Sequence, residues 1–419
     1  MQTVLIQFED ENYNIISSTI QVPTTMTKDQ LLSLINGPPS LNLYIDGIEI
    51  IDSLSNSINN INPEEIITIT THKDEKMARP SSHCSSSFSG HEGPVLCIKI
   101  LSNCIISGGG DCTLRIWDRI TKTQKKIIKR DNHWIMCLDA NNDKIVTGAM
   151  DGRINVYDGN GEYKDSLLLA KDTITGIKII DDIFIFSSRD KTVRVVKDRK
   201  VIFSYTHDHP VNGFIYKDRY LISYGRDGKV KIFYYENTFI FIKEIQMNSS
   251  VSAVEKNHNY FIIGCEDGNV YVYKQDTTNN DDGNNNDKKT NSNDNKNNKD
   301  NYNSDIKFVY KLQHSSTISS ISSYGLFCAT ASFDKKIKIF NLSKGNIISS
   351  YVHNDWVYKI ILNNNYVISS SKDKTIKVYD YKNKKMISDL ICRDEVYCFD
   401  IEEEKIVAGC KDRMVYFFE

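Results

Sequence analysis

The stretch GCKDRMVYFFE at Gly409–Glu419 contains a pattern that recurs along this chain. Alternating apolar residues follow the turn at Asp412, over Met414–Phe418, and this alternation is typical of a β-strand with a buried face. An apolar strand with an open edge promotes aggregation. The pattern therefore predicts that another segment of the chain pairs with this strand and covers its edge.

Seven earlier stretches repeat the same pattern. They read GGGDCTLRIW, GAMDGRINVY, SSRDKTVRVV, YGRDGKVKIF, GCEDGNVYVY, ASFDKKIKIF and SSKDKTIKVY. The residue three positions after the aspartate is aliphatic in all eight copies, and the residue six positions after it is aromatic in all but one, where Val196 stands. This shared register predicts the same strand in eight structural repeats.

The spacing of these repeats predicts an eight-bladed β-propeller over 81–419. Successive aspartates are 37 to 40 residues apart, except for one interval of 67, and a period of ~40 residues is typical of four-stranded propeller blades. The long interval holds a polar, Asn- and Asp-rich run at about 275–305, which we expect to be a disordered loop between blades five and six. Because the last repeat stops after its third strand, we expect Ser82–His91 to supply the fourth and close the ring.

The first repeat resembles a WD repeat, through GHEGPVLCI and SGGGDCTLRIWD. The resemblance implies a buried hydrogen-bond network, which here would join His91, Ser107, Asp111 and Trp117. A Ser-His-Asp hydrolase triad is the alternative, but no Gly-x-Ser-x-Gly elbow surrounds Ser107, so we favour the structural network. At the histidine position, later repeats have His207, His314 and His353, whereas Asp131 and Cys392 replace it in blades that we expect to be softer.

Residues 1–72 predict a separate domain. TVLIQFED and IISSTIQVP are typical of two strands, and a helix with Thr27 and Gln30 at capping-box spacing follows. LNLYIDGIEII and IITITT then predict the remaining strands. This order is that of a ubiquitin-like β-grasp domain, and residues 73–80 form a charged linker.

Composition and motifs disfavour several other classes of protein. The 419 residues are 40% hydrophobic with a formal net charge of −2, so no strong overall charge indicates nucleic acid or membrane as a partner. We expect no membrane span. Ten cysteines without a Cys-x-x-Cys pair disfavour a metal site in this chain alone, and we expect free thiols and no cofactor of its own. Nucleotide-binding and metalloprotease motifs are absent from the sequence, which predicts a protein that is not an enzyme.

The whole arrangement resembles the Notchless family of ribosome-assembly factors. NPEEIITITT, RPSSHCSSSFSGH and ISDLICRDEVYCFD carry the closest likeness, although Trp117 is the only tryptophan at the aromatic repeat position. The resemblance implies that the propeller docks, as a monomer, on a precursor of the large ribosomal subunit, among rRNA, ribosomal proteins and other assembly factors. It also implies that the N-terminal domain is gripped by the AAA ATPase midasin, in the nucleolus and nucleus.

In that family a carboxylate completes the coordination of a Mg²⁺ ion held by midasin, and the matching residue here is Glu64. Mg²⁺ takes one or two carboxylates in such sites. Strand parity supports this choice, because Glu64 shares it with Ile66 and Thr68 on the outward face, whereas Glu65 shares it with Ile67 and Ile69 on the expected core face.

One rim of the propeller carries further candidate contacts to rRNA or protein. Residues before the turn aspartates and before the inner strands include basic and aromatic side chains: Arg189, Arg226, Phe333, Lys372 and Lys411, with Trp134 and Trp356. Such residues bind phosphates or anchor a partner, or they are ordinary solvated charges and caps of the core.

These features predict a non-enzymatic adaptor that transmits the pull of midasin to the precursor particle. The alternative is a scaffold in a ubiquitin or signalling pathway, in which the propeller selects substrates. The fold permits both functions.

Overall fold

The computed structural model describes residues 3–9, 15–35, 37, 41–45, 48–50, 53–54, 66–73, 83–236, 238–275, 306–403 and 405–419. The chain divides into two compact units, one built on Met1–Arg79 and the other on Pro80–Tyr324 with Cys328–Glu419.

The first unit is a five-stranded mixed sheet with one helix. Its elements are β1 (Thr3–Glu9), β2 (Ile20–Pro23), α1 (Lys28–Leu34), β3 (Leu41–Ile45), β4 (Ile48–Glu49) and β5 (Ile66–Lys73). The strand order is β2-β1-β5-β3-β4, and β1 and β5 are parallel.

Capping and burial explain the local structure of this unit. The predicted capping box is present at the start of α1, where the Thr27 backbone N–H donates to Gln30 Oε1 at 3.0 Å. Leu31 and Leu32 of α1 are buried in one core with Phe8 and Ile69 of the sheet. On β5, Ile69 is fully buried whereas Ile66 is 48% exposed, which agrees with the predicted parity of that strand.

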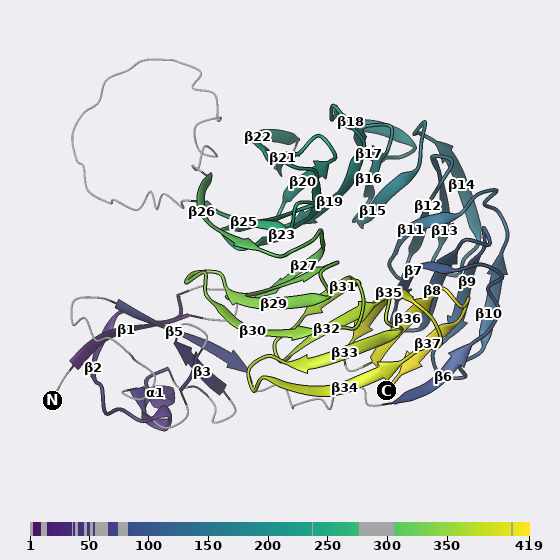
Figure 1. Ribbon diagram of the computed structural model, residues 1–419. Helices are drawn as coiled ribbons and strands as arrows, with labels where there is room; N and C mark the ends of the chain where they lie inside the picture. The colour runs from purple at the N-terminus through teal and green to yellow at the C-terminus, as the bar shows by residue number, and fades with distance from the viewer. Residues whose placement is uncertain are drawn as a thin grey trace, which may run out of the picture. The chain divides into compact units, whose positions relative to one another are not determined.

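The second unit consists of four-stranded antiparallel sheets, which we number blades 1 to 8 (Figure 1). Blade 1 contains β7 (Val95–Ile100), β8 (Cys104–Gly109), β9 (Leu114–Asp118) and β10 (Gln124–Ile128); blade 2 contains β11 (Ile135–Ala140), β12 (Lys144–Ala149), β13 (Arg153–Asp158) and β14 (Tyr163–Leu168); blade 3 contains β15 (Ile174–Ile180), β16 (Ile183–Ser188), β17 (Thr192–Lys197) and β18 (Lys200–Thr206); blade 4 contains β19 (Val211–Lys217), β20 (Tyr220–Gly225), β21 (Lys229–Tyr235) and β22 (Phe239–Gln246).

The remaining blades follow the same plan. Blade 5 contains β23 (Val251–Asn257), β24 (Tyr260–Cys265), β25 (Asn269–Gln275) and β26 (Ile306–Gln313); blade 6 contains β27 (Ile318–Tyr324), β28 (Phe327–Ser332), β29 (Lys336–Asn341) and β30 (Ile347–Val352); blade 7 contains β31 (Val357–Leu362), β32 (Tyr366–Ser371), β33 (Thr375–Asp380) and β34 (Lys385–Ile391); blade 8 contains β35 (Val396–Glu402), β36 (Lys405–Cys410), β37 (Val415–Phe418) and β6 (Cys84–Phe88).

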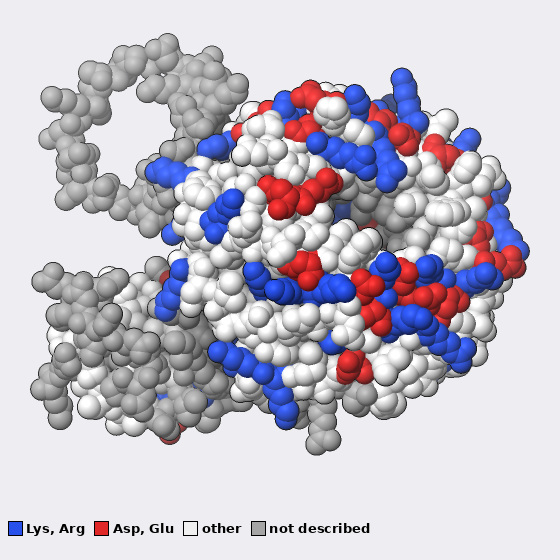
Figure 2. All heavy atoms as spheres, in the orientation of Figure 1, with Lys and Arg blue, Asp and Glu red and all other residues white. Residues whose placement is uncertain are grey.

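The inner strands of these blades form a closed cycle. Each of β7, β11, β15, β19, β23, β27, β31 and β35 contacts the next in this order, and β35 contacts β7. Figure 1 shows the blades of this unit around a common centre. In Figure 2, acidic and basic side chains alternate over its visible face, which fits the near-neutral charge of the chain.

The predicted ring closure is confirmed. β6 pairs antiparallel with β37, with Val415 opposite Phe88 and Tyr416 opposite Ser87. Phe417 and Phe418 are 1% exposed. The segment before the first blade therefore supplies the outer strand of blade 8. It covers the edge of β37, which would otherwise be open to pairing with another chain.

The predicted place of the long insertion is wrong. It was expected between blades five and six, but Ile306–Gln313 pairs with β25 as the outer strand of blade 5. The insertion therefore joins the third and fourth strands within that blade. Residues 276–305 lie outside the described part of the chain. Their expected disorder therefore stays a prediction.

Candidate functional site

The four residues predicted to form a network in blade 1 lie together in its interior. His91 Nδ1 is 2.9 Å from Asp111 Oδ2, and His91 Nε2 is 2.8 Å from Ser107 Oγ. The Trp117 indole N–H donates to the same Ser107 oxygen at 2.8 Å. Ser107 is fully buried, so no substrate reaches its hydroxyl and the network is structural.

Hydrogen bonds fix the ionisation of the carboxylate in this network. Burial alone would raise the pKa of Asp111, but hydrogen bonds from His91 and from the Glu92 backbone N–H lower it well below its ordinary value. The same lowering holds for Asp334, beside His314, and for Asp373, beside His353.

The network recurs in three more blades and is replaced in the other four. The complete sets are His207–Ser223–Asp227, His314–Thr330–Asp334 and His353–Ser369–Asp373. The residue 20 positions before the turn aspartate is Asp131, Ala170, Met247 and Cys392 in blades 2, 3, 5 and 8, and all four are buried. Sequence reasoning missed Ala170 and Met247, which the 20-residue spacing identifies.

Blade 2 contains a buried carboxylate where the other networks have a histidine. Asp131 Oδ1 accepts a hydrogen bond from Asn155 Nδ2 at 2.6 Å, and the Tyr157 hydroxyl donates to Oδ2 at 3.5 Å. Burial raises the pKa of Asp131 to about 6, although the Asn155 hydrogen bond opposes this. The ionised form of this side chain therefore destabilises the folded blade at neutral pH.

Four aromatic side chains meet on the rim of blades 6, 7 and 8. The rings of Phe333 and Trp356 stack with centroids 5.0 Å apart, and Tyr358 meets Phe333 edge-on at 6.3 Å. Tyr397 meets Tyr358 edge-on at 5.7 Å. We call these four residues the aromatic cluster.

Charged groups hold this cluster in place. Lys372 Nζ lies 4.3 Å from the centroid of the Trp356 ring, a cation–π contact. The Tyr358 hydroxyl donates to Glu395 Oε2 at 2.9 Å, and Lys411 Nζ lies 2.8 Å from Glu395 Oε1. Trp356 nevertheless remains 42% exposed, so an ordered aromatic surface with adjacent cations is open to solvent.

The structure thus brings together four of the seven predicted rim residues: Phe333, Trp356, Lys372 and Lys411. Arg189 and Arg226 come from turns of blades 3 and 4, and Trp134, which is 47% exposed, comes from the start of blade 2. Sequence reasoning missed Tyr358, Tyr397 and Glu395. Each stands directly before or after the first residue of an inner strand that faces the rim, and that position was the available signal.

Glu64 and its neighbour Glu65 lie outside the described residues. Within the described ranges, no group of three or more His, Cys, Asp or Glu side chains is arranged to hold a metal ion. All ten cysteines are unpaired. No helix in the described part of the chain is long and apolar enough to cross a membrane.

Comparison with known proteins agrees with this geometry. The family model "WD domain, G-beta repeat" matches residues 82–118, 124–158 and 306–341, and "TEP-1 C-terminal beta-propeller" matches 353–419. The propeller of Sqt1 from Saccharomyces cerevisiae has a TM-score of 0.67 at 14% identity and covers 81% of this chain and 99% of its own. A structure of Chaetomium thermophilum Sqt1, bound to the N-terminus of ribosomal protein L10, also has a TM-score of 0.67, at 16% identity, over 81% of this chain and 100% of its own. The chain is a mainly-β WD-repeat propeller protein.

Two relatives found by sequence comparison are ribosome-assembly proteins or their homologues. Ribosome assembly protein 4 of Saccharomyces cerevisiae is 26% identical over 148 residues, which are 29% of this chain and 29% of the relative. The Notchless protein homolog of Arabidopsis thaliana is 27% identical over 135 residues, 29% of this chain and 28% of the relative. The chain thus matches under a third of the length of either relative. Together with the WD repeats, these matches to two ribosome-assembly factors support the predicted resemblance to the Notchless family.

Proposed function

We propose that this protein is a non-enzymatic assembly factor of the large ribosomal subunit, which acts in the nucleolus and nucleus. An eight-bladed propeller docks on the precursor particle through the aromatic cluster. A ubiquitin-like N-terminal domain is engaged by the AAA ATPase midasin through Glu64, and the chain transmits the remodelling force. The sequence similarity to ribosome assembly protein 4 and a Notchless homolog supports a role in ribosome assembly.

The aromatic cluster is the observation that carries the docking proposal. Interface hot spots are enriched in Trp, Tyr and Arg, and they gain most when their rings are already ordered. The Trp356 ring is ordered in this way, because it stacks on the Phe333 ring and contacts Lys372 Nζ. Lys372, which has no salt-bridge partner among the described residues, suits a partner with acidic groups or phosphates at its edge.

A segment of a ribosomal protein is one partner that this surface suits. The Chaetomium thermophilum propeller with the same fold is bound to the N-terminus of ribosomal protein L10. We propose that the ordered rings of this chain offer a place for such a segment.

The first unit supports the second half of the proposal. Its strand order, β2-β1-β5-β3-β4 with α1 between β2 and β3, is that expected of a ubiquitin-like β-grasp. Glu64 stands two residues before β5, with the parity of the half-exposed Ile66. We propose that the carboxylate of Glu64 completes the oxygen shell of a Mg²⁺ ion held by the partner.

Affinity purification of the tagged full chain tests the proposed process. We expect large-subunit precursor proteins, their rRNA and midasin to co-purify with it. Recovery of ubiquitin ligases or proteasome components, without precursor particles, would instead establish the scaffold alternative and overturn the proposal.

A further inference from the structure

A polar pocket lies between blades 1 and 2, and its lining includes the β7–β8, β11–β12 and β13–β14 connections and part of β10. Its volume is about 280 Å³, near the lower end of small-molecule sites. Leu101 and Ile116 contribute apolar wall, and Lys125, Lys126, Asn103 and Asn160 contribute polar groups. Side-chain amides both donate and accept hydrogen bonds, so the lining suits a flat polar group that carries a negative charge.

Lys125 occupies a position that the fold does not reserve for a charge. In every blade the outer strand has a bulge, and one residue there is skipped by the pairing with the third strand. From blade 1 to blade 8 the skipped residue is Lys125, Lys164, Ile202, Ile242, Val309, Ile348, Ile387 and Ser85. Five of the eight are aliphatic, so the position does not need a cation, and a bulge redirects its side chain.

The charge of Lys125 is available to a ligand. Lys164, at the same position of blade 2, pairs with Asp158 at 3.0 Å, and Lys126 pairs with Glu162 at 2.5 Å. Among the described residues, Lys125 has no salt-bridge partner. Asp118 is one acidic group whose charge reaches Lys125, and Asp118 Oδ1 already accepts hydrogen bonds from the backbone N–H groups of Ile120 and Thr121.

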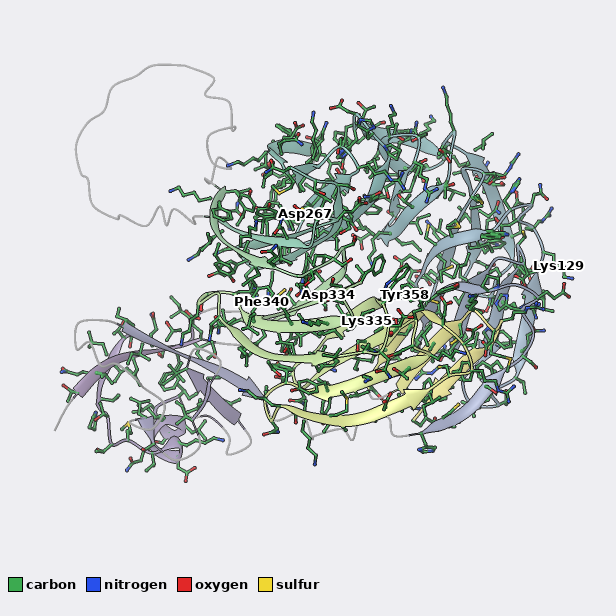
Figure 3. All side chains as sticks on the ribbon, viewed as in Figure 1. Lys129, Asp267, Asp334, Lys335, Phe340 and Tyr358 are labelled. Carbon is green, nitrogen blue, oxygen red and sulfur yellow. The ribbon has the colours of Figure 1, made fainter. Side chains whose placement is uncertain are left out.

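More positive charge continues along the same edge. Lys129 is exposed, has no salt-bridge partner in the described part of the chain, and projects from the outer edge of blade 1 in Figure 3. It stands four residues from Lys125, a span of about 13 Å along a strand. The guanidinium of Arg130 stacks 4.4 Å from the Tyr163 ring centroid. A chain of phosphates would meet successive cations here, whereas one carboxylate side chain would use only the first.

We propose that this pocket binds one nucleotide of a single-stranded nucleic acid. The base lies against Leu101 and Ile116 with its polar edge toward the asparagine amides, and its phosphate contacts Lys125. Lys129 contacts a phosphate further along the strand. Sequence-specific recognition of single strands commonly uses such splayed bases with hydrogen bonds to their edges. The inference rests on blades 1 and 2 alone and is independent of the proposed contact with midasin.

Fluorescence anisotropy of the full chain with a labelled ten-residue oligouridylate tests the site. The main variant is Lys125→Ile, because isoleucine is the residue at the same bulge in other blades and the fold accepts it there. We expect Lys125→Ile to weaken binding about 5- to 10-fold, and to reduce the slope of log K against log[salt] by roughly 0.7, the contribution of one phosphate contact to a single strand. Lys129→Ile should have a similar but smaller effect.

Lys385→Ile is the matched control, since Lys385 is exposed on the outer strand of blade 7 and its loss changes the net charge equally. It should bind like wild type. Equal binding by wild type and Lys125→Ile would overturn the inference, as would equal competition by polyglutamate and RNA. If Lys125→Ile melts early, Lys125→Gln replaces it under the same criteria. Uridine monophosphate should compete only weakly with the oligonucleotide. If it competes as well as the oligonucleotide and Lys129→Ile has no effect, the pocket binds a free nucleotide, and the inference of a bound single strand is overturned.

Discussion

Replacing Asp131 with asparagine should stabilise the propeller at neutral pH. The pKa of Asp131 is raised by burial from 3.8 to about 6, and a difference of about 2 between folded and unfolded pKa values corresponds to about 3 kcal/mol. Asparagine keeps the shape and still accepts the hydrogen bond from Asn155. The asparagine NH₂ group replaces the oxygen that accepts the Tyr157 hydrogen bond, and this loss offsets part of the gain. We therefore expect the free energy of unfolding to rise by about 1 to 3 kcal/mol, which raises Tm by a few degrees.

The sign of the pH dependence follows from the raised pKa. Between pH 3.8 and 6 the folded state holds more protons on Asp131 than the unfolded state, so the stabilisation is present at low pH and is lost as the pH rises through 6. The cost of the ionised form is about 1.5 kcal/mol at pH 5 and about 3 kcal/mol at pH 7.5. The advantage of Asp131→Asn over wild type should therefore be about 1.5 kcal/mol larger at pH 7.5 than at pH 5.

Thermal unfolding at pH 5 and pH 7.5 measures this difference. Asp111→Asn is the matched control, because the same substitution in blade 1 removes a carboxylate whose pKa is lowered, and it should destabilise at pH 7.5. The reasoning is refuted if Asp131→Asn melts below wild type at pH 7.5, or if its advantage is the same at both pH values.

Three further changes test other parts of the account. Deletion of Ser82–His91 should expose the edge of β37 and cause aggregation or early melting, and an unchanged Tm with a monomeric elution profile would contradict the ring closure. Replacing 276–305 with a few Gly and Ser residues should leave Tm nearly unchanged, since loop entropy depends weakly on length; failure to fold would reveal a structured element there. Glu64→Gln and Glu64→Asp should each weaken midasin binding by about 2 to 5 kcal/mol at unchanged Tm, while Glu65→Gln binds like wild type; the reverse pattern would make Glu65 the ligand.

The repeat register could be predicted from sequence because it depends on local chemistry. Each turn aspartate accepts backbone hydrogen bonds from the residues after it, as Asp111 does from Thr113, and the strand that follows alternates. An open apolar edge on the last strand would promote aggregation, so this edge required a partner. Ser82–His91 could therefore be assigned to it from the sequence.

Other features depend on contacts that no local pattern encodes. Tyr358 and Tyr397 come close only because β31 and β35 are neighbours in the closed ring. The outer strand β26 has a mostly exposed pattern, and its position after the long insertion hid its membership of blade 5. The bulge that distinguishes Lys125 is visible only in the pairing register.

Sedimentation of tagged protein through a sucrose gradient of cell extract, with wild type compared with Trp356→Ala, tests whether the aromatic cluster docks the protein on precursor particles. Trp356 is 42% exposed, so its removal should lower Tm by only a few degrees while removing the central ring of the docking surface. We expect wild type to sediment with large-subunit precursors and Trp356→Ala to shift to the top of the gradient. Trp356→Ala that still sediments with the precursors as fully as wild type would contradict docking through the aromatic cluster.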